Sequence, residues 1–379
     1  MSAGSAAASE VVETMHSTIA AGPFRRPGPQ SGPIRSLVYR TVRDITRIAG
    51  TGVDRALAPI ERLVPDTEPG VRRAAAMAVL NGVIGDHLAQ SANPLAIEMR
   101  LCRDGQALDV NSQALRSALP DLNGKILVLV HGLCSNDHFW LRGGHDYGRD
   151  LARDLGYTPL YLHYNTGRHI SDNGRELSDL LTELVLGWPV PVDELVLIGH
   201  SMGGLVARSA CHYGEQSPDV AWRSKLSRLV CLGTPHHGAP LERGGNWLQV
   251  LLGVSRYSAP LVRLAKIRSA GITDLRYGTV LDGAHDRFEP LGDCRQPVGL
   301  PEGVACYAVA ATLSPEGVTR PRGDGLVPVA SALGHHTDSQ LALGFPVEHQ
   351  HVVTTTGHLD LVGSDEVYRT LTGWLENPA

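Results

Sequence analysis

A glycine-flanked serine directly after a short apolar run is the feature that most constrains how this chain folds. Ser201 lies in the run Gly199-His200-Ser201-Met202-Gly203-Gly204, after the apolar residues 195–198 and before the helix-like residues 205–208. Such a serine occupies a sharp turn between a strand and a helix, where strained backbone dihedral angles present its hydroxyl. Side chains at positions 199 and 203 would collide with neighbouring backbone, so glycine is needed there. The pattern predicts a nucleophilic serine.

From residue 97 onward, short apolar segments alternate with segments of helical periodicity. This alternation is typical of an α/β fold, a mainly parallel sheet with helices on both faces. The continuous apolar run Ile126–Val130 indicates a strand that is buried on both sides. The predicted strands are Ile97–Leu101, Ile126–Val130, Thr158–His163, Glu194–Ile198, Leu226–Leu232 and Val304–Ala311, and the predicted helices are Tyr147–Leu155, Asn173–Leu186 and Glu366–Leu375.

Two stretches precede this alternating pattern. Residues 1–33 are rich in Ala, Ser, Gly and Pro and are predicted to form a flexible tail. Residues 34–95 are predicted to form an N-terminal helical extension of the 96–379 domain, with apolar residues at helical spacing over 34–64 and an Ala- and Leu-rich helix over Val71–Gln90. Packing on the core, packing on a sister subunit and contact of residues 34–64 with a membrane or lipid surface are all open. The oligomeric state is open as well.

A serine nucleophile needs a general base, and position favours His358 among the 17 histidines. His358 lies near the C-terminus, after a candidate last strand and before the predicted helix Glu366–Leu375. A loop at that place can deliver an imidazole to the serine, where it acts first as general base and then as general acid. His349 and His351 are the nearest alternatives.

An acidic side chain orients such a histidine and stabilises its protonated form. Asp324 is flanked by glycine on both sides and follows the predicted strand Val304–Ala311. The two glycines permit a tight turn, which a solvated aspartate would not need. Asp360 and Asp338 are weaker candidates, because the first is only two residues from His358 and the second lies in a polar, histidine-rich loop.

Acyl transfer also requires N–H groups that bind the oxyanion of a tetrahedral intermediate. The run His131-Gly132-Leu133 follows the predicted strand Ile126–Val130, where a loop with this task belongs. The backbone N–H groups of Leu133 and of Met202, the residue after the serine, are the predicted donors. The alternative is that Gly132 merely turns the chain.

Five motifs together resemble those of bacterial lipases and their esterase relatives, and they are also similar to those of the inositol-deacylase-like α/β-hydrolases. The likeness spans roughly residues 120–375, with nucleophile, acid and histidine in the order of the family. It implies an α/β-hydrolase fold in which Ser201, Asp324 and His358 form the catalytic triad. The motifs are His131-Gly132-Leu133, Gly199-His200-Ser201-Met202-Gly203-Gly204, Gly233-Thr234-Pro235-His236-His237-Gly238, Gly323-Asp324-Gly325-Leu326-Val327 and Gly357-His358-Leu359-Asp360.

The resemblance has consequences for ligands. In the family, a loop of the His131-Gly132-Leu133 kind is associated with medium and longer acyl chains, which implies a lipid-like ester as substrate. Some members bind calcium near the histidine loop, where Asp360 would be the matching ligand, but a second acidic ligand is not evident. No other cofactor is expected. Many secreted members begin with a signal peptide, whereas this N-terminus lacks a basic region followed by a long apolar core.

Residues 239–303 lie outside the predicted sheet. They include the apolar runs Trp247–Leu252 and Leu261–Leu264. An insertion of this length at this place predicts a helical cap with its apolar face toward an acyl pocket. The same side chains could instead only anchor the insertion to the core, and the two interpretations are compatible. The polar segment Asn165–Ser171, after a predicted strand, has no assigned role beyond a turn near the site.

Composition excludes some function classes. The net charge of −5 and the aromatic content of 5% argue against a nucleic-acid partner. No apolar run approaches the roughly 20 residues of a membrane-spanning helix. A cytoplasmic protein is therefore expected, with membrane association left open. The six cysteines lack paired metal spacing, and a disulfide between Cys294 and Cys306 is a minor alternative.

The motifs favour a serine carboxylic-ester hydrolase that works through an acyl-enzyme intermediate. An acyltransferase or a thioesterase would use the same triad, so the sequence does not separate these activities. The choice between esterase and true lipase is open for the same reason. A non-catalytic binding protein that keeps the fold is the least favoured hypothesis, because every expected catalytic residue is present.

Overall fold

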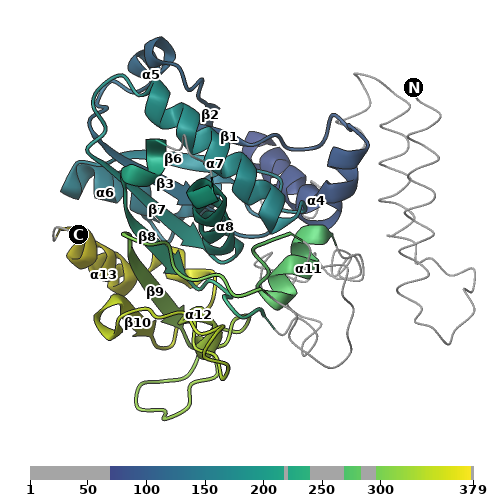
Figure 1. Ribbon diagram of the computed structural model, residues 1–379, viewed down its shortest axis with the longest axis vertical. Coiled ribbons are helices and arrows are strands. Elements are labelled where there is room, and N and C mark those ends of the chain that lie inside the picture. Colours follow the sequence, from purple (N-terminus) through teal and green to yellow (C-terminus); the bar gives the residue numbers. More distant parts are fainter. Residues whose placement is uncertain (1–68, 217–220, 240–268, 283–295, 377–379) are drawn as a thin grey trace, which may run out of the picture.

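The computed structural model describes residues 69–216, 221–239, 269–282 and 296–376. Within them the main element is an eight-stranded sheet with strand order β10-β9-β8-β7-β3-β6-β1-β2 (Figure 1). Pairing is parallel from β10 to β6, whereas β1 runs antiparallel to both β6 and β2. The strands are β1 (Arg100–Arg103), β2 (Gln106–Ala107), β3 (Lys125–Val130), β6 (Thr158–His163), β7 (Glu194–His200), β8 (Leu226–Leu232), β9 (Ala305–Ala311) and β10 (Gln350–Val353). The predicted mainly parallel sheet is confirmed.

Helices cover both faces of this sheet (Figure 1). One face packs on α6 (Tyr147–Leu155) and α13 (Asp365–Glu376). The other packs on α5 (Ser112–Ala118), α7 (Ile170–Gly187) and α8 (Met202–Gln216). Three further helices are α4 (Pro69–Gln90), α11 (Ala270–Tyr277) and the short α12 (Val329–Ala332), and β4 (Leu141–Arg142) pairs with β5 (His145–Asp146) as a separate hairpin.

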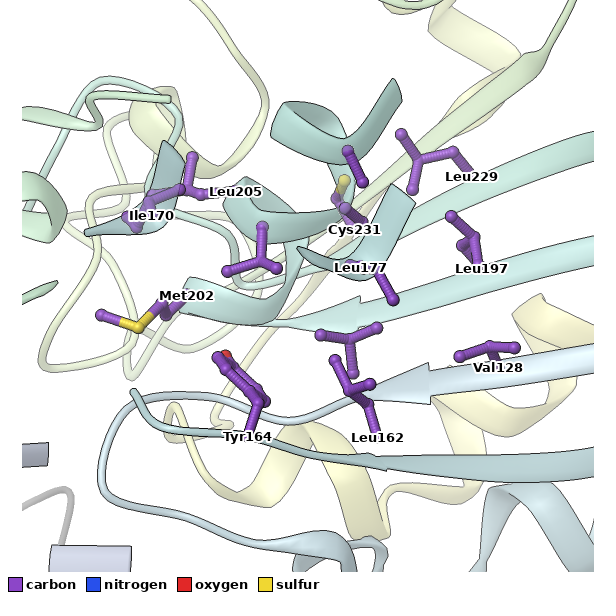
Figure 2. Close-up of a cluster of buried hydrophobic side chains, with 14 of the residues drawn as sticks. Val128, Leu162, Tyr164, Ile170, Leu177, Leu197, Met202, Leu205, Leu229 and Cys231 are labelled. Carbon is purple, nitrogen blue, oxygen red and sulfur yellow. The ribbon is translucent and has the colours of Figure 1, made fainter. Parts of the chain in front are cut away.

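Burial of the central strands explains why their sequences are apolar without interruption. In β3 every residue after Lys125 is buried, because helices lie on both sides of it. Figure 2 shows the core on the side of α7 and α8, where side chains of neighbouring strands meet those of the helices. Each fully buried leucine or valine there contributes about 1.5–3 kcal/mol to folding. This packing fixes where the strand ends lie.

The largest differences from the predicted boundaries are at the starts of two elements, and in both cases a hydrogen bond to a side chain of another helix lies at the boundary. The first strand is β1, Arg100–Arg103, rather than Ile97–Leu101, because the Ile97 N–H donates to Asn81 Oδ1 of α4 at 2.9 Å. Helix α7 begins at Ile170 rather than Asn173, because the Ile170 N–H donates to Asp274 Oδ2 of α11 at 2.8 Å.

Several predictions fall wholly or largely outside the described residues. The structure does not describe the predicted tail over 1–33, the predicted lipid-contact segment over 34–64 or Cys294. Of the predicted cap over 239–303, the structure describes Ala239, residues 269–282, which include α11, and residues 296–303. The helix predicted over Val71–Gln90 is α4. Among the described residues, no helix combines the length and the apolar character needed to cross a membrane.

Candidate active site

Ser201 occupies the turn between β7 and α8 with a φ of 55°, a left-handed conformation that is uncommon for a residue other than glycine. Its N–H donates to the carbonyl oxygen of Leu232 in β8 at 2.8 Å, and its own carbonyl accepts the Gly204 N–H at 3.1 Å. Both bonds tie the turn to the parallel sheet and to the helix that follows. The strained serine predicted from the sequence is confirmed as a backbone feature.

Glycines make this turn sterically feasible. A Cβ at Gly199 would lie 2.5 Å from the backbone nitrogen of Gly204, and a Cβ at Gly203 would lie 2.1 Å from the Val130 carbonyl oxygen of β3. A Cβ at Gly132 would lie 3.0 Å from the Ser201 Cβ. The loop after β3 therefore approaches the serine as closely as backbone allows.

Asp324 and His358 form a buried pair at the same end of the sheet. His358 Nδ1 donates to Asp324 Oδ2 at 2.7 Å, and these two side chains are 0% and 1% exposed. A second bond joins their backbones, since the His358 N–H donates to the Asp324 carbonyl at 3.1 Å. The histidine is thus held in one orientation from two directions.

The turn around Asp324 orients its carboxylate. Gly323 has a φ of 139° and Gly325 a φ of 98°, so both glycines adopt conformations that other residues avoid. Asp324 Oδ1 accepts the N–H groups of Leu326 at 2.9 Å and Val327 at 2.7 Å, which leaves Oδ2 for His358. The tight turn predicted from the two glycines is therefore confirmed.

The far nitrogen of His358 is available. Among the described residues His358 Nε2 is buried and has no hydrogen-bond partner. Gly233, which follows Leu232 of β8, leaves room for the ring, because a Cβ there would lie 3.3 Å from His358 Cε1. Since the Ser201 N–H donates to the Leu232 carbonyl, the backbone of the serine and the ring of the histidine both lie at the end of β8.

Two backbone donors are free beside the serine. Among the described hydrogen bonds, none uses the N–H of Leu133 or that of Met202. His131, at the start of the same loop, donates from Nδ1 to the Gly132 carbonyl at 2.9 Å, and burial lowers the pKa of His131 to about 3. The His131 ring is therefore neutral, and its single N–H is already bound to the Gly132 carbonyl. The donors that the loop can offer to a ligand are its peptide N–H groups.

Sequence reasoning missed His200, the residue before the serine. Its Nε2 donates to the His358 carbonyl at 3.0 Å, and the two rings lie 4.8 Å apart. Burial and the nearby His358 lower the pKa of His200 well below its usual value, so His200 is neutral. The only signal was its place inside the serine motif, which says nothing about where its side chain points.

The alternative residues lie in other surroundings. His349 Nδ1 donates to the Cys306 carbonyl at 3.1 Å, and His351 Nε2 contacts Glu366 Oε1 at 2.9 Å. Asp338 is exposed and accepts a backbone N–H from within its own loop. None of these contacts joins the pair formed by Asp324 and His358.

Asp360 does not fit the predicted calcium ligand well. Its carboxylate contacts the Arg142 guanidinium at 3.2 Å and is 66% exposed. Among the described residues, no group of three or more His, Cys, Asp or Glu side chains is placed to hold a metal ion. A hard cation needs several oxygen ligands, and here a cation already neutralises the one candidate.

The predicted site residues therefore all follow strands of the parallel sheet: Ser201 and Met202 after β7, Leu133 after β3, Asp324 after β9 and His358 after β10. Residues 121–292 match a family model described as PGAP1-like alpha/beta domain. The chain has the α/β-hydrolase fold. In such sheets ligands bind at the carboxyl ends of the strands, where these residues lie.

Relatives of this α/β-hydrolase chain are distant. A GPI inositol-deacylase of Debaryomyces hansenii is 30% identical over 95 residues, which cover 24% of this chain and only 9% of that protein. Among solved structures, the mature lipase BlEst2 of Bacillus licheniformis is 17% identical, with 66% of this chain and 92% of that chain covered and a TM-score of 0.44. The Pyrococcus furiosus esterase Pf2001 is 13% identical, with 68% and 84% covered and a TM-score of 0.39.

Proposed function

We propose that this chain is a serine carboxylic-ester hydrolase that acts on lipid-like acyl esters. One observation carries the proposal: a buried aspartate–histidine pair with a free Nε2 lies at the same end of the sheet as a serine in a left-handed turn. Nucleophile, base and orienting acid are the three parts of a serine hydrolase, and their order along the chain is that of the α/β-hydrolases.

Acylation follows from the proposed roles. Ser201 Oγ attacks the ester carbonyl carbon while His358 Nε2 takes the hydroxyl proton. The resulting oxyanion accepts hydrogen bonds from the free N–H groups of Leu133 and Met202. Asp324 Oδ2 keeps the His358 Nδ1–H in place and stabilises the imidazolium. His358 then gives its proton to the leaving alcohol, and the acyl group remains on Ser201.

Deacylation repeats these steps with water. His358 Nε2 removes a proton from the water that attacks the acyl carbonyl, and the same two N–H groups hold the second oxyanion. When this intermediate collapses, Ser201 regains its proton from His358 and the carboxylic acid leaves. The buried position of the pair favours this chemistry, because charges interact more strongly where water is excluded.

The substrate class is proposed from two sources. The resemblance to lipases associates a loop of the His131-Gly132-Leu133 kind, in which an apolar residue supplies the N–H, with medium and longer acyl chains. The name of the Debaryomyces hansenii relative adds an acyl group on an inositol hydroxyl as a substrate to test. Both point to an acyl chain on an alcohol oxygen rather than to a peptide.

The test is hydrolysis of p-nitrophenyl butyrate and octanoate, together with fluorophosphonate labelling. We expect turnover of both esters and one label at Ser201, and we expect Ser201→Ala to lose both while keeping its thermal unfolding midpoint. Ser224→Ala, a substitution at an exposed serine just before the start of β8 and so at the opposite end of that strand from the site, is the matched control and should behave as wild type. A folded wild-type protein that neither turns over esters nor takes the label would refute the proposal.

A chain-length series on soluble and emulsified esters then separates esterase from lipase. Product analysis with a competing alcohol separates hydrolysis from acyl transfer, because a transferase would form the new ester in preference to the free acid. Thioester substrates in the same series test the thioesterase alternative.

A further inference from the structure

The polar segment Asn165–Ser171, which follows β6 and had no role assigned from the sequence, lies against the loop after β3. Thr166 is buried, and its Oγ1 accepts the N–H of Cys134 at 3.2 Å. Cys134 directly follows Leu133 and has a φ of 58°. A left-handed cysteine needs support from its surroundings, and this hydrogen bond supplies it at the end of the loop that carries the proposed oxyanion donor.

The other end of the loop is held by Tyr164, the residue that directly precedes this segment. Tyr164 donates its hydroxyl to the His131 carbonyl at 2.8 Å, and the two rings stack with centroids 4.6 Å apart. Tyr164 and Met202, whose N–H is the second proposed donor, belong to the same buried cluster (Figure 2). The loop 131–134 is thus bound at its first residue by Tyr164 and at its last by Thr166.

The segment itself is anchored to the rest of the fold. Asn165 donates from Nδ2 to the Gly85 carbonyl of α4 at 2.9 Å and accepts the Gly167 N–H on Oδ1 at 3.0 Å. Asn173 of α7 donates to the Asn165 carbonyl at 3.0 Å. Because these bonds come from two helices, Tyr164 and Thr166 sit on a support that does not depend on the loop.

We infer that Tyr164 and Thr166 are positioning residues that clamp the oxyanion loop from both ends and so aim the Leu133 N–H. The inference rests on the proposed function, since it assigns a role to that same site. Neither side chain is required to touch the substrate. Their effect passes through backbone, and a displacement of a catalytic donor by about 1 Å can cost roughly 100-fold in rate.

The test compares both ends of β6. Thr166→Val removes the acceptor at similar volume, and Tyr164→Phe removes only the hydroxyl. The controls are Thr158→Val and Tyr157→Phe at the start of the strand, where Thr158 Oγ1 accepts the Asn123 N–H at 3.2 Å and the Tyr157 hydroxyl contacts Glu194 at 3.1 Å. Each control variant therefore loses one side-chain hydrogen bond at the end of β6 that is farther from Ser201 and Leu133.

We expect kcat per fluorophosphonate-titrated site to fall about 10- to 100-fold in Thr166→Val and about 10-fold in Tyr164→Phe, with KM changed less than about threefold. The Ki of an alkylboronic acid, which mimics the tetrahedral intermediate, should rise by similar factors. Thr166→Ser keeps the acceptor and should restore kcat. A merely structural role would lower the unfolding midpoint and leave these constants per active site unchanged.

Wild-type kcat and boronate affinity in folded Tyr164→Phe would overturn the clamp, and so would equal losses in the two control variants. If Thr166→Val does not fold, Tyr164→Phe beside its control Tyr157→Phe still decides the matter. Failure of the proposed function looks different, because the wild-type protein itself would then show neither turnover nor labelling.

Discussion

Backbone strain at single residues gathers at the strand ends. Of the five non-glycine residues with positive φ that the structure describes, three lie in the loops after β3, β7 and β10, namely Cys134, Ser201 and Thr355; the other two, Ala92 and Asp104, follow α4 and β1. Each such conformation costs of order 1–3 kcal/mol and persists only where surrounding contacts hold it. Backbone hydrogen bonds hold two of these residues: the Ser201 N–H donates to the Leu232 carbonyl at 2.8 Å, and the Thr355 N–H donates to the Ser314 carbonyl at 3.1 Å. The concentration of strain agrees with the proposed site.

At the same scale, Asp324→Asn tests the acid. An amide places an N–H where Asp324 now accepts only, so His358 would adopt the wrong tautomer or lose its orientation. We expect kcat to fall by about 10⁴-fold, the size of effect seen when a triad aspartate is so changed. Steady-state kinetics on p-nitrophenyl butyrate measure it, with exposed Asp338→Asn as the control. Wild-type rates in Asp324→Asn would assign the acid role to another carboxylate.

At the scale of elements, α4 reaches the oxyanion loop through a glycine. A Cβ at Gly82 would lie 2.3 Å from the Cys134 Sγ and 3.1 Å from its Cα. The helix also receives the Ser269 hydroxyl of the turn before α11, which donates to the Gly82 carbonyl at 2.7 Å. Helix α4 therefore packs directly on the site, although it precedes the sheet in the sequence.

Gly82→Ala should therefore displace the loop. We expect a destabilisation of about 1–3 kcal/mol, from forcing a methyl group into a packed contact, and a lower kcat for ester hydrolysis. Gly70→Ala in the same helix is the control, because nothing lies within 4 Å of a Cβ there. That control should leave kcat unchanged and keep or slightly raise stability. Urea unfolding and ester kinetics on both variants decide the matter, and equal behaviour of the two would contradict the contact.

For the whole molecule, buried neutral histidines make stability depend on pH. Burial lowers the pKa values of His131 and His200, so the native state leaves both unprotonated where the unfolded chain, with a pKa near 6.5, binds protons. Their contribution is fully present above about pH 6.5 and is lost as the pH falls below it. The loss approaches about 1.4 kcal/mol per pH unit for each group.

His200→Gln should remove one such contribution. Below about pH 6.5 the free energy of unfolding of wild type should fall more steeply with falling pH than that of the variant. We expect the difference between the two slopes to reach at most about 1.4 kcal/mol per pH unit. Urea unfolding at pH 7.5, 6.5 and 5.5 measures the difference, and exposed His335→Gln should follow the wild-type curve. A His200→Gln curve parallel to wild type would show that folding does not lower the pKa of His200.

The sequence by itself determined the order of the central elements and the identity of the predicted site residues. A strand buried on both faces must be apolar throughout, and a serine in a left-handed turn needs glycine at set distances, so both leave local patterns. The strand Thr158–His163 and the helix Tyr147–Leu155 were predicted to the residue for this reason. Position along the chain favoured His358 over the alternative histidines, and position together with two flanking glycines favoured Asp324 over the alternative aspartates. The structure places Asp324 and His358 in contact.

Only the tertiary structure decided which distant groups meet. The start of β1 depends on Asn81, and the start of α7 on Asp274, more than 100 residues away in the chain. The contacts of Thr166 with Cys134 and of His200 with His358 likewise join loops from separate strands. A hydrogen bond of this kind leaves no periodicity in the sequence, because its two partners become neighbours only after the sheet has formed.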